Sequence, residues 1–242
     1  MLPGQAWRGV VVDLWGTLLY PSVSLEEYSR ERARRIAEAL RARGASLGED
    51  EVLEAYKRAR RLADRVRNIT MIEVSLEGEV VMLLDELGLE PSEELVSEVS
   101  EAFIQPYLSL VKPAEGARGF LEGAKKMGYR LVLASNTMST RHSVELLRRH
   151  GLAELFDYMA FSDSVGFRKP HPRFFAHIVA EAGIAPRESF FVGDEEADIR
   201  GAKLCGFKTI AYTGFHPYTG NTQPDCTAHS FDAVAECMEK LA

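Results

Sequence analysis

The stretch Gly9-Val-Val-Val-Asp-Leu-Trp-Gly-Thr17 decides the fold that we expect for this 242-residue chain. It begins with an apolar run of strand length and continues through Asp13 into a glycine turn. This pattern is typical of a buried central strand that leads into a tight turn. A strand that is apolar on both faces is favoured in a sheet with helices on both sides. The stretch therefore predicts an α/β protein with this strand inside the sheet.

The segment that follows this strand changes to the periodicity of helices. From about Ser24 to Leu110 the chain is rich in Ala, Leu, Glu and Arg, and its apolar residues recur every three or four positions. Such spacing indicates amphipathic helices. Breaks are expected near residues 44–48, 67–70 and 88–92. We therefore predict about four helices that form a small bundle.

The chain after Pro113 alternates between helices and short apolar strands. Repeated β–α units of this kind favour a parallel sheet with helices on both faces. The first strand and this later half are expected to form one sheet, interrupted by the helical insertion. The expected helices span residues 117–127, 140–150 and 196–204, and the expected strands span residues 131–134, 190–192 and 209–212.

Composition and charge narrow the classes of partner. The net charge is −7 and the sequence contains no block of basic residues. We therefore expect a small molecule, and not nucleic acid, as the ligand. The longest apolar runs fall far short of the roughly 20 residues that span a bilayer, and no export signal is visible. We therefore expect a cytoplasmic protein without a membrane partner, whose oligomeric state stays open. Cys205, Cys226 and Cys237 are odd in number and lack CxxC spacing, so neither a disulfide framework nor a zinc site is expected.

Polar residues follow three of the expected strands. Asp13 ends the first run, Ser135 and Asn136 end the run from 131, and Asp194 follows the run from 190. Because ligands of open α/β sheets bind beyond the carboxyl ends of the strands, we expect these side chains to meet at one rim. Lys169 lies in a loop between two of these elements.

The chemistry of such a rim suits phosphoryl transfer. Asp13 can act as a nucleophile and form a covalent acyl phosphate. Asp194 and Asp198 lie four residues apart where a strand leads into a helix, so both can bind a hard cation through oxygen. Three clustered carboxylates repel one another unless a cation is present, and this favours Mg²⁺ as cofactor.

Other residues of the rim can bind the phosphoryl group. Lys169 adds a point charge within reach of Asp13 and a phosphoryl oxygen. Ser135 and backbone N–H groups near Gly16 and Thr17 would donate hydrogen bonds to other oxygens.

Four stretches of the chain, in order, resemble the motifs of the haloacid dehalogenase-like superfamily. The resemblance covers essentially the whole chain and implies a Rossmann-like core of residues 1–20 and 113–242, with a helical cap inserted at residues 21–112. The four stretches are Asp13-Leu-Trp-Gly-Thr17, Leu131-Val-Leu-Ala-Ser-Asn136, Lys169-Pro and Gly193-Asp-Glu-Glu-Ala-Asp198.

The resemblance also implies roles and an activity. Asp13 would be the nucleophile and, with the carbonyl of Trp15, a magnesium ligand; Asp194 and Asp198 would be the acids of the metal site. Ser135 would donate to the phosphate, with Asn136 beside it, and Lys169 would balance charge. The implied activity is that of a Mg²⁺-dependent phosphatase that acts on a small phosphorylated metabolite through an aspartyl-phosphate on Asp13.

One position departs from that pattern. Phosphatases of this superfamily usually carry a second aspartate two residues after the nucleophile, as acid and then base, and here Trp15 stands there. An indole N–H donates a hydrogen bond but is no acid near neutral pH. General acid–base catalysis is worth roughly 10² to 10⁴ in rate. We therefore expect a slow phosphatase, a substitute acid from cap or substrate, or different chemistry.

Three alternatives follow from this departure. True 2-haloacid dehalogenases resemble the chain in an aromatic residue at this place and a Ser-Asn pair, and they use the same Asp nucleophile without metal; the intact Gly193-Asp194 argues against this function. A phosphonate hydrolase with a Schiff-base lysine, Lys57 or Lys112, has little support. A non-catalytic protein that binds or senses a phosphorylated ligand would not need the nucleophile.

An arginine cluster and the histidines are the remaining residue types that could serve a function. Arg65, Arg67 and Asn68 interrupt the helical pattern at an expected loop, where the two arginines could bind an anionic part of the substrate, although a solvated helix end is the more ordinary interpretation. His171 is expected to be a loop residue. The other histidines, His216 among them, are scattered and receive no role.

Overall fold

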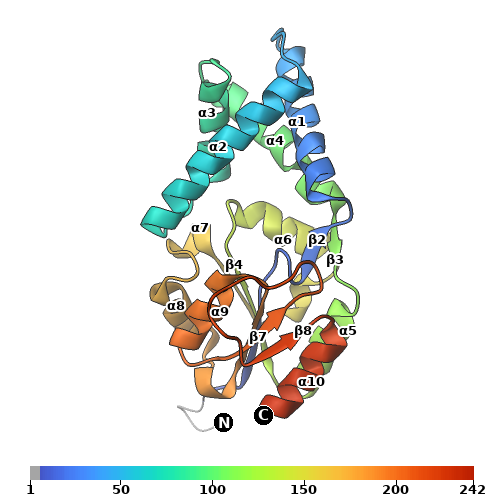
Figure 1. Cartoon of the computed structure of the whole chain (residues 1–242), viewed down its shortest axis with the longest axis vertical. Helices are drawn as coiled ribbons and strands as arrows, with labels where there is room; N and C mark the ends of the chain where they lie inside the picture. Colours follow the sequence, from blue (N-terminus) through green and yellow to red (C-terminus); the bar gives the residue numbers. More distant parts are fainter. Residues whose placement is uncertain (1–5) are drawn as a thin grey trace. The chain divides into compact units, whose positions relative to one another are not determined.

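The computed structural model describes residues 6–242 and divides the chain into two compact units (Figure 1). Residues 1–5, the start of the predicted core segment 1–20, lie outside the described residues. The sheet unit contains the chain up to Tyr20, Lys112–Thr137 and Leu147–Ala242; the helical unit contains Pro21–Val111 and Met138–Leu146. The helical unit thus also includes residues 138–146, which the predicted boundary at residue 113 places in the core.

The sheet unit is built on a six-stranded parallel sheet in the order β5-β4-β1-β6-β7-β8. The predicted α/β class is confirmed. Sequence patterns had not predicted β5 and β8, which are short and lie at the two edges. The strands are β1 Gly9–Val12, β4 Arg130–Ser135, β5 Tyr158–Phe161, β6 Phe190–Gly193, β7 Lys208–Tyr212 and β8 Cys226–Ala228.

Strand β1 lies inside the sheet because its side chains can be buried on both faces. Val10, Val11 and Val12 have no exposed surface. Val12 is in register with Leu133 of β4 on one side and with Val192 of β6 on the other. The three strands therefore end side by side, and the residues that follow them share one rim.

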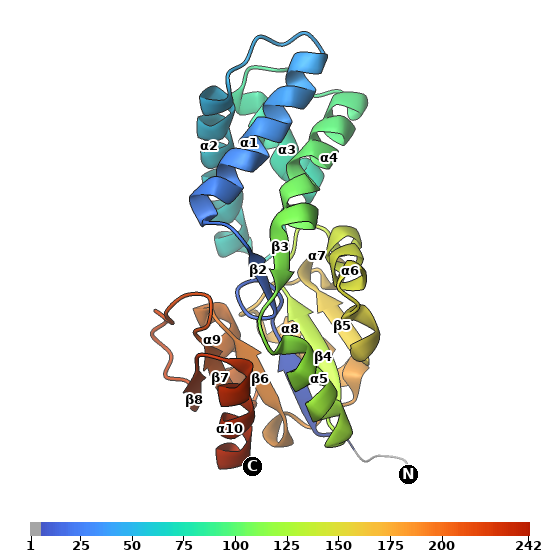
Figure 2. The same cartoon turned by 90° about the vertical axis from the view of Figure 1, so that its right-hand side faces the viewer.

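Helices cover both faces of the sheet (Figure 2). On one face α5 (Ala117–Lys126) and α10 (Phe231–Leu241) meet through Phe120 and Phe231, whose ring centroids are 5.2 Å apart. On the other face lie α8 (Pro172–Ala182) and α9 (Glu196–Leu204). The remaining short elements are α6 Thr140–Arg149, α7 Ser162–Val165 and the 3₁₀ turns Ala153–Leu155 and Pro186–Glu188. His171 begins α8 as its N-cap.

The segment Pro21–Val111 of the helical unit contains four helices, as predicted. Ser24 caps the first one in a capping box with Glu27, which satisfies backbone donors at the helix start. Strands β2 (Leu19–Pro21) and β3 (Val111–Pro113), which pair with each other, link the two units. The four helices are α1 Leu25–Ala42, α2 Glu49–Thr70, α3 Leu76–Glu86 and α4 Glu93–Leu110.

No loop lies at residues 65–68, so the prediction of a loop there is wrong. Helix α2 continues to Thr70 and ends at Met71, whose backbone is left-handed with φ 56°. Arg67 is 2% exposed and its Nη2 lies 2.6 Å from Glu79 Oε2. The prediction that Arg67 binds substrate is therefore also wrong, because its guanidinium is buried and forms ion pairs with carboxylates of the same unit. Arg65 is exposed on the same helix, and its role stays a prediction.

The expectation that no disulfide forms is wrong for two of the three cysteines. Cys226 of β8 and Cys237 of α10 form a disulfide, with Cα atoms 6.0 Å apart. The chain turns back after β8 and brings positions 11 residues apart into contact, which a search for CxxC spacing does not test. Cys205 is a half-buried free thiol.

The lengths and hydropathies of the helices bear on membrane insertion. Within residues 6–242, none is both long enough and apolar enough to cross a bilayer.

Candidate active site

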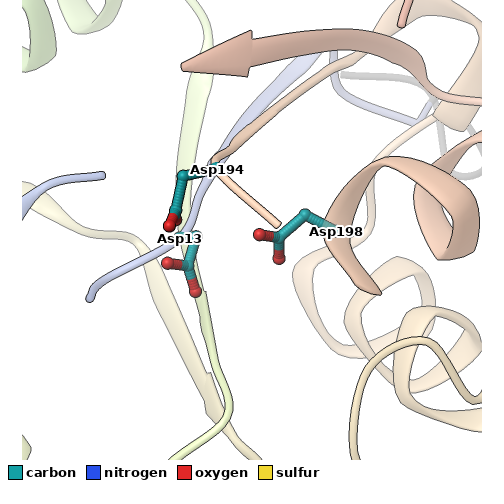
Figure 3. A group of neighbouring side chains, drawn as sticks. All are labelled: Asp13, Asp194 and Asp198. Carbon is teal, nitrogen blue, oxygen red and sulfur yellow. The ribbon is translucent and has the colours of Figure 1, made fainter. Parts of the chain in front are cut away.

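Three buried aspartates meet at the carboxyl ends of β1 and β6 (Figure 3). Asp13 follows β1, Asp194 follows β6, and Asp198 lies in the first turn of α9. They are 5%, 2% and 2% exposed, and one oxygen of each lies within 4.8 Å of the others. The rim that the sequence predicted therefore exists in the sheet unit, with the predicted acids in it.

The turn after Asp13 packs against Asp194. Leu18 N and Leu19 N donate to Leu14 O at 3.0 and 2.8 Å and close the turn. Gly16 has φ +85°, and a Cβ at that position would collide with the Asp194 carboxylate, so only glycine suits the place.

Besides Gly16, Thr17 and Trp15 of this turn are predicted to face the substrate or the metal. The Oγ1 of Thr17 donates to Asp194 Oδ1 at 2.8 Å, so its hydroxyl orients an acid of the site. Trp15 is partly buried in the same turn, where its backbone forms a β-bridge with Leu19. The part of its carbonyl in metal binding stays a prediction.

Asp198 both caps a helix and contacts a residue of the site. Glu195 N donates to Asp198 Oδ2 at 3.1 Å as half of a capping box that begins α9. The other oxygen, Oδ1, lies 2.6 Å from Lys169 Nζ. The start of the helix therefore fixes the carboxylate so that its second oxygen faces the site.

Lys169 lies buried among acceptors at the rim. Its Nζ forms an ion pair with Asp13 Oδ1 and donates to Ala134 O at 2.8 Å. The loop that carries it is held by Asn136, because Lys169 N donates to Asn136 Oδ1 at 2.8 Å and Asn136 Nδ2 donates to Lys169 O at 3.1 Å. The side chain of Asn136 thus positions Lys169, a contact that the sequence did not reveal. Ser135 is buried at the end of β4.

The electrostatics of this cluster are unbalanced. Burial raises the pKa of Asp13 well above its usual range, the nearby Asp198 and Asp194 raise it further, and Lys169 opposes them. Burial, with repulsion from Asp198, raises the pKa of Asp194 to about 8. Burial lowers the pKa of Lys169, but attraction by Asp13 and Asp198 outweighs it and the net shift is upward. Three carboxylates facing one ammonium form an oxygen donor set that fits a hard divalent cation.

His216 is a residue of this site that sequence reasoning missed. Its Nε2 lies 2.8 Å from Asp194 Oδ2. His216 comes from the segment between β7 and β8, 22 positions after Asp194, and no motif or spacing marks it. Only the fold, which returns this segment to the rim, could reveal the contact.

Residues 7–206 match the family model of haloacid dehalogenase-like hydrolases, so the chain belongs to this family. A curated relative, the glyceraldehyde 3-phosphate phosphatase of Methanopyrus kandleri, is 27% identical over 97% of this chain and 98% of its own. Two solved structures share the fold at lower identity. The 2-haloacid dehalogenase of Pseudomonas syringae has a TM-score of 0.72 at 20% identity, covering 98% and 100% of the two chains. The HAD-hydrolase YfnB of Bacillus subtilis, solved with magnesium, has 0.70 at 18% identity, covering 97% and 99%.

Proposed function

We propose that this hydrolase is a Mg²⁺-dependent phosphatase of a small phosphorylated metabolite and that Asp13 is its nucleophile. The observation that carries the proposal is the cluster of three buried carboxylates around Lys169. Such an excess of buried negative charge is costly without a cation and suits an anionic substrate with one. The full-length relative named as a glyceraldehyde 3-phosphate phosphatase supports the substrate class.

The residues of the rim divide the chemistry among them. Asp13 attacks phosphorus, the bond to the leaving oxygen breaks, and an aspartyl-phosphate forms; water then attacks phosphorus, releases inorganic phosphate and regenerates Asp13. Lys169 holds Asp13 Oδ1 and keeps the nucleophile oriented.

A cation would complete this site. Asp13, Asp194, Asp198 and the carbonyl of Trp15 would hold Mg²⁺, which when bound supplies positive charge against the carboxylates and the phosphoryl group. Ser135 and backbone N–H groups near Gly16 would bind phosphoryl oxygens.

The missing acid at Trp15 gives a prediction about the leaving group. p-Nitrophenyl phosphate, whose leaving group is stable as an anion, should turn over faster than alkyl phosphates such as glycerol 3-phosphate, by roughly 10² or more in kcat. Steady-state kinetics on the two substrates at saturating Mg²⁺ measure this ratio. Equal rates would show that another group protonates the leaving oxygen.

The same residue keeps a second function open. Trp15 beside an Asp nucleophile also suits a 2-haloacid dehalogenase, in which Asp13 would attack carbon, expel halide and form an ester that water hydrolyses. Neither a metal nor the pair Asp194 and Asp198 would then be needed. A protein that only binds a phosphorylated ligand would release neither phosphate nor halide.

One screen separates these functions. Metal-stripped protein is incubated with glyceraldehyde 3-phosphate, 2-phosphoglycolate, hexose phosphates and 2-chloropropionate, each with Mg²⁺, with Ca²⁺ or with chelator, and phosphate and chloride release are measured. We expect phosphate release with Mg²⁺ but not with Ca²⁺, whose larger coordination shell misplaces the reacting atoms. Asp13→Asn and Asp194→Asn should be inactive controls. Chloride release that chelator does not reduce would overturn the phosphatase proposal.

A further inference from the structure

The segment between β7 and β8, residues 213–225, is fastened to the helix that carries Asp198. Glu196, in the first turn of α9, accepts hydrogen bonds from Tyr218 Oη at 2.9 Å, Thr222 N at 2.9 Å and Thr222 Oγ1 at 2.6 Å. Lower on the same helix, Lys203 Nζ donates to Gln223 O at 2.7 Å. These contacts join the segment to α9 at two levels, so its path is defined. We call it the β7–β8 loop.

Two adjacent residues of the β7–β8 loop reach the rim. The ring of Phe215 stacks on Tyr20 with centroids 5.0 Å apart. The Nε2 of His216 lies 2.8 Å from Asp194 Oδ2, and its Nδ1 lies 3.0 Å from Pro217 O. Of the two ring nitrogens, Nε2 faces the carboxylate of the site and Nδ1 faces the backbone of the loop itself.

The contact completes a set of donors around Asp194. Thr17 Oγ1 donates to Oδ1 of this carboxylate at 2.8 Å, and His216 Nε2 contacts Oδ2. When Asp194 is ionised, as a cation ligand is, its carboxylate only accepts, so the Nε2–H of His216 is the donor in this contact. The two donors come from opposite ends of the chain and hold the carboxylate from both sides. Asp194 is 2% exposed, so little of its carboxylate is open to water.

His216 does not fit as a direct ligand of the same cation. Atoms that bind one Mg²⁺ at about 2.1 Å lie at most about 4.2 Å apart. Among residues 6–242 only one group of three or more His, Cys, Asp and Glu residues brings its ligand atoms within 4.8 Å of one another, and it consists of Asp13, Asp194 and Asp198 without His216. His216 therefore contacts an acid of the site and lies outside the candidate ligand set.

We propose that His216 is a positioning residue of the cation site. Through Nε2 it holds the Asp194 carboxylate in the orientation that binds the cation, and the β7–β8 loop delivers it there. Outer partners of metal ligands are worth about 10- to 100-fold in metal affinity. The inference rests on the proposed function in one respect, that a cation binds at the three aspartates.

Calorimetric titration of the metal-stripped full chain with MgCl₂ tests the inference without an assay of activity. His216→Phe keeps an aromatic ring and removes the donor, and we expect it to raise the Kd for Mg²⁺ by about 10- to 100-fold. His216→Gln places an amide donor near the position of Nε2 and should retain affinity within about threefold. His229→Ala, at an exposed histidine outside the β7–β8 loop, is the matched control and should leave the Kd unchanged.

The outcomes separate this inference from the proposed function. If His216→Phe binds Mg²⁺ as wild type does while Asp194→Asn does not, the positioning role is wrong and the cation site stands. If wild type itself binds no Mg²⁺, the proposed function fails first. The His216 side chain is 39% exposed, so folding should tolerate its loss; circular dichroism checks this, and His216→Ala is the second variant. An equal loss of affinity in the Phe and Gln variants would contradict a role for the donor.

Discussion

Within residues 6–242, the helical unit and the sheet unit each contain a cluster of buried charge, and the two clusters differ in their balance of positive and negative charge. In the helical unit Arg67 contacts Glu79 and Glu73 at 2.6 Å each and Asp64 at 2.9 Å. Arg60 adds a second guanidinium, 3.3 Å from Glu79. In the sheet unit three aspartates share the single ammonium of Lys169.

The pKa shifts show the consequence of that difference. Burial lowers the pKa of Arg67, yet the attraction of Glu79 outweighs it, so the pKa is raised and the ion pair is maintained. In the sheet unit the pKa of Asp13 and that of Asp194 are raised, because the lysine does not compensate for burial and mutual repulsion. A balanced buried cluster is complete within the chain, whereas an unbalanced one favours a ligand of opposite charge. This contrast separates Arg67, whose charge is paired within its own unit, from Lys169, for which we propose a role in the active site.

Removal of the proposed nucleophile should give the largest effect. We expect Asp13→Asn to lower kcat on the order of 10⁴-fold or more, because the amide cannot form the acyl phosphate. The variant should fold as wild type, since it keeps the shape and removes one repelling charge. Kinetics of phosphate release with circular dichroism measure both. Turnover within tenfold of wild type would contradict covalent catalysis by Asp13.

Removal of a carboxylate from the balanced cluster should instead cost stability. Glu79→Gln leaves Arg67 buried without its shortest partner in α3 and should lower the free energy of unfolding by about 3 kcal/mol. Asp64→Asn is the matched control, because that side chain is 46% exposed and exposed pairs contribute about 1 kcal/mol or less. Urea unfolding followed by circular dichroism compares them. Equal losses in the two variants would mean that burial does not distinguish these ion pairs.

Sequence patterns predicted the acidic cluster of the sheet unit but not the ion pairs of the helical unit. The apolar run before Asp13 and the spacing of Asp194 and Asp198 mark local features, a strand end and a helix start, so the rim and its acids could be predicted. The partners of Arg67 are set by how α2 packs against α3, and periodicity carries no such information. Its charge therefore suggested a solvated or substrate-binding residue.

The contacts that sequence reasoning missed share a cause. His216 reaches Asp194 through a long loop, Asn136 holds Lys169 across 33 positions, and Cys226 meets Cys237 through the packing of α10 on β8. Each depends on tertiary packing between elements and leaves no periodic or motif signal. The edge strands β5 and β8 were missed because Tyr-Met-Ala-Phe and Cys-Thr-Ala lack the continuous valine or phenylalanine run that marked β1 and β6.

Addition of a cation should stabilise the unbalanced unit. At pH 8, Mg²⁺ at about 100 times its Kd should raise the free energy of unfolding by about 2.7 kcal/mol, since it binds only the folded site. Thermal unfolding with and without MgCl₂ in chelator-treated protein measures the gain. The gain should disappear in Asp194→Asn and persist in Glu79→Gln, provided that this variant folds. A gain of the same size in Asp194→Asn would place the binding elsewhere.

A further expected effect is a dependence of metal-free stability on pH that originates at Asp194. Its pKa rises from an ordinary value near 4 to about 8 in the folded protein. Between these values the folded chain holds a proton that the unfolded chain has lost, so this contribution to stability is full below about pH 4 and is lost as the pH rises through 8. Asp194→Asn should remove this dependence and gain stability at pH 8 relative to wild type.

Asp225 provides the matched control of opposite sign. Although burial favours its protonated form, hydrogen bonds from Lys203 and Thr209 lower its pKa. Its contribution is therefore present above the ordinary pKa and is lost as the pH falls through the lowered value. Asp225→Asn should consequently lose stability at pH 8, where Asp194→Asn gains it. Urea unfolding of the two variants at pH 5 and pH 8 in chelator measures both signs. If Asp194→Asn loses stability at pH 8 as Asp225→Asn does, the carboxylate of Asp194 is compensated within the chain, and the contrast between the two units fails at its central residue.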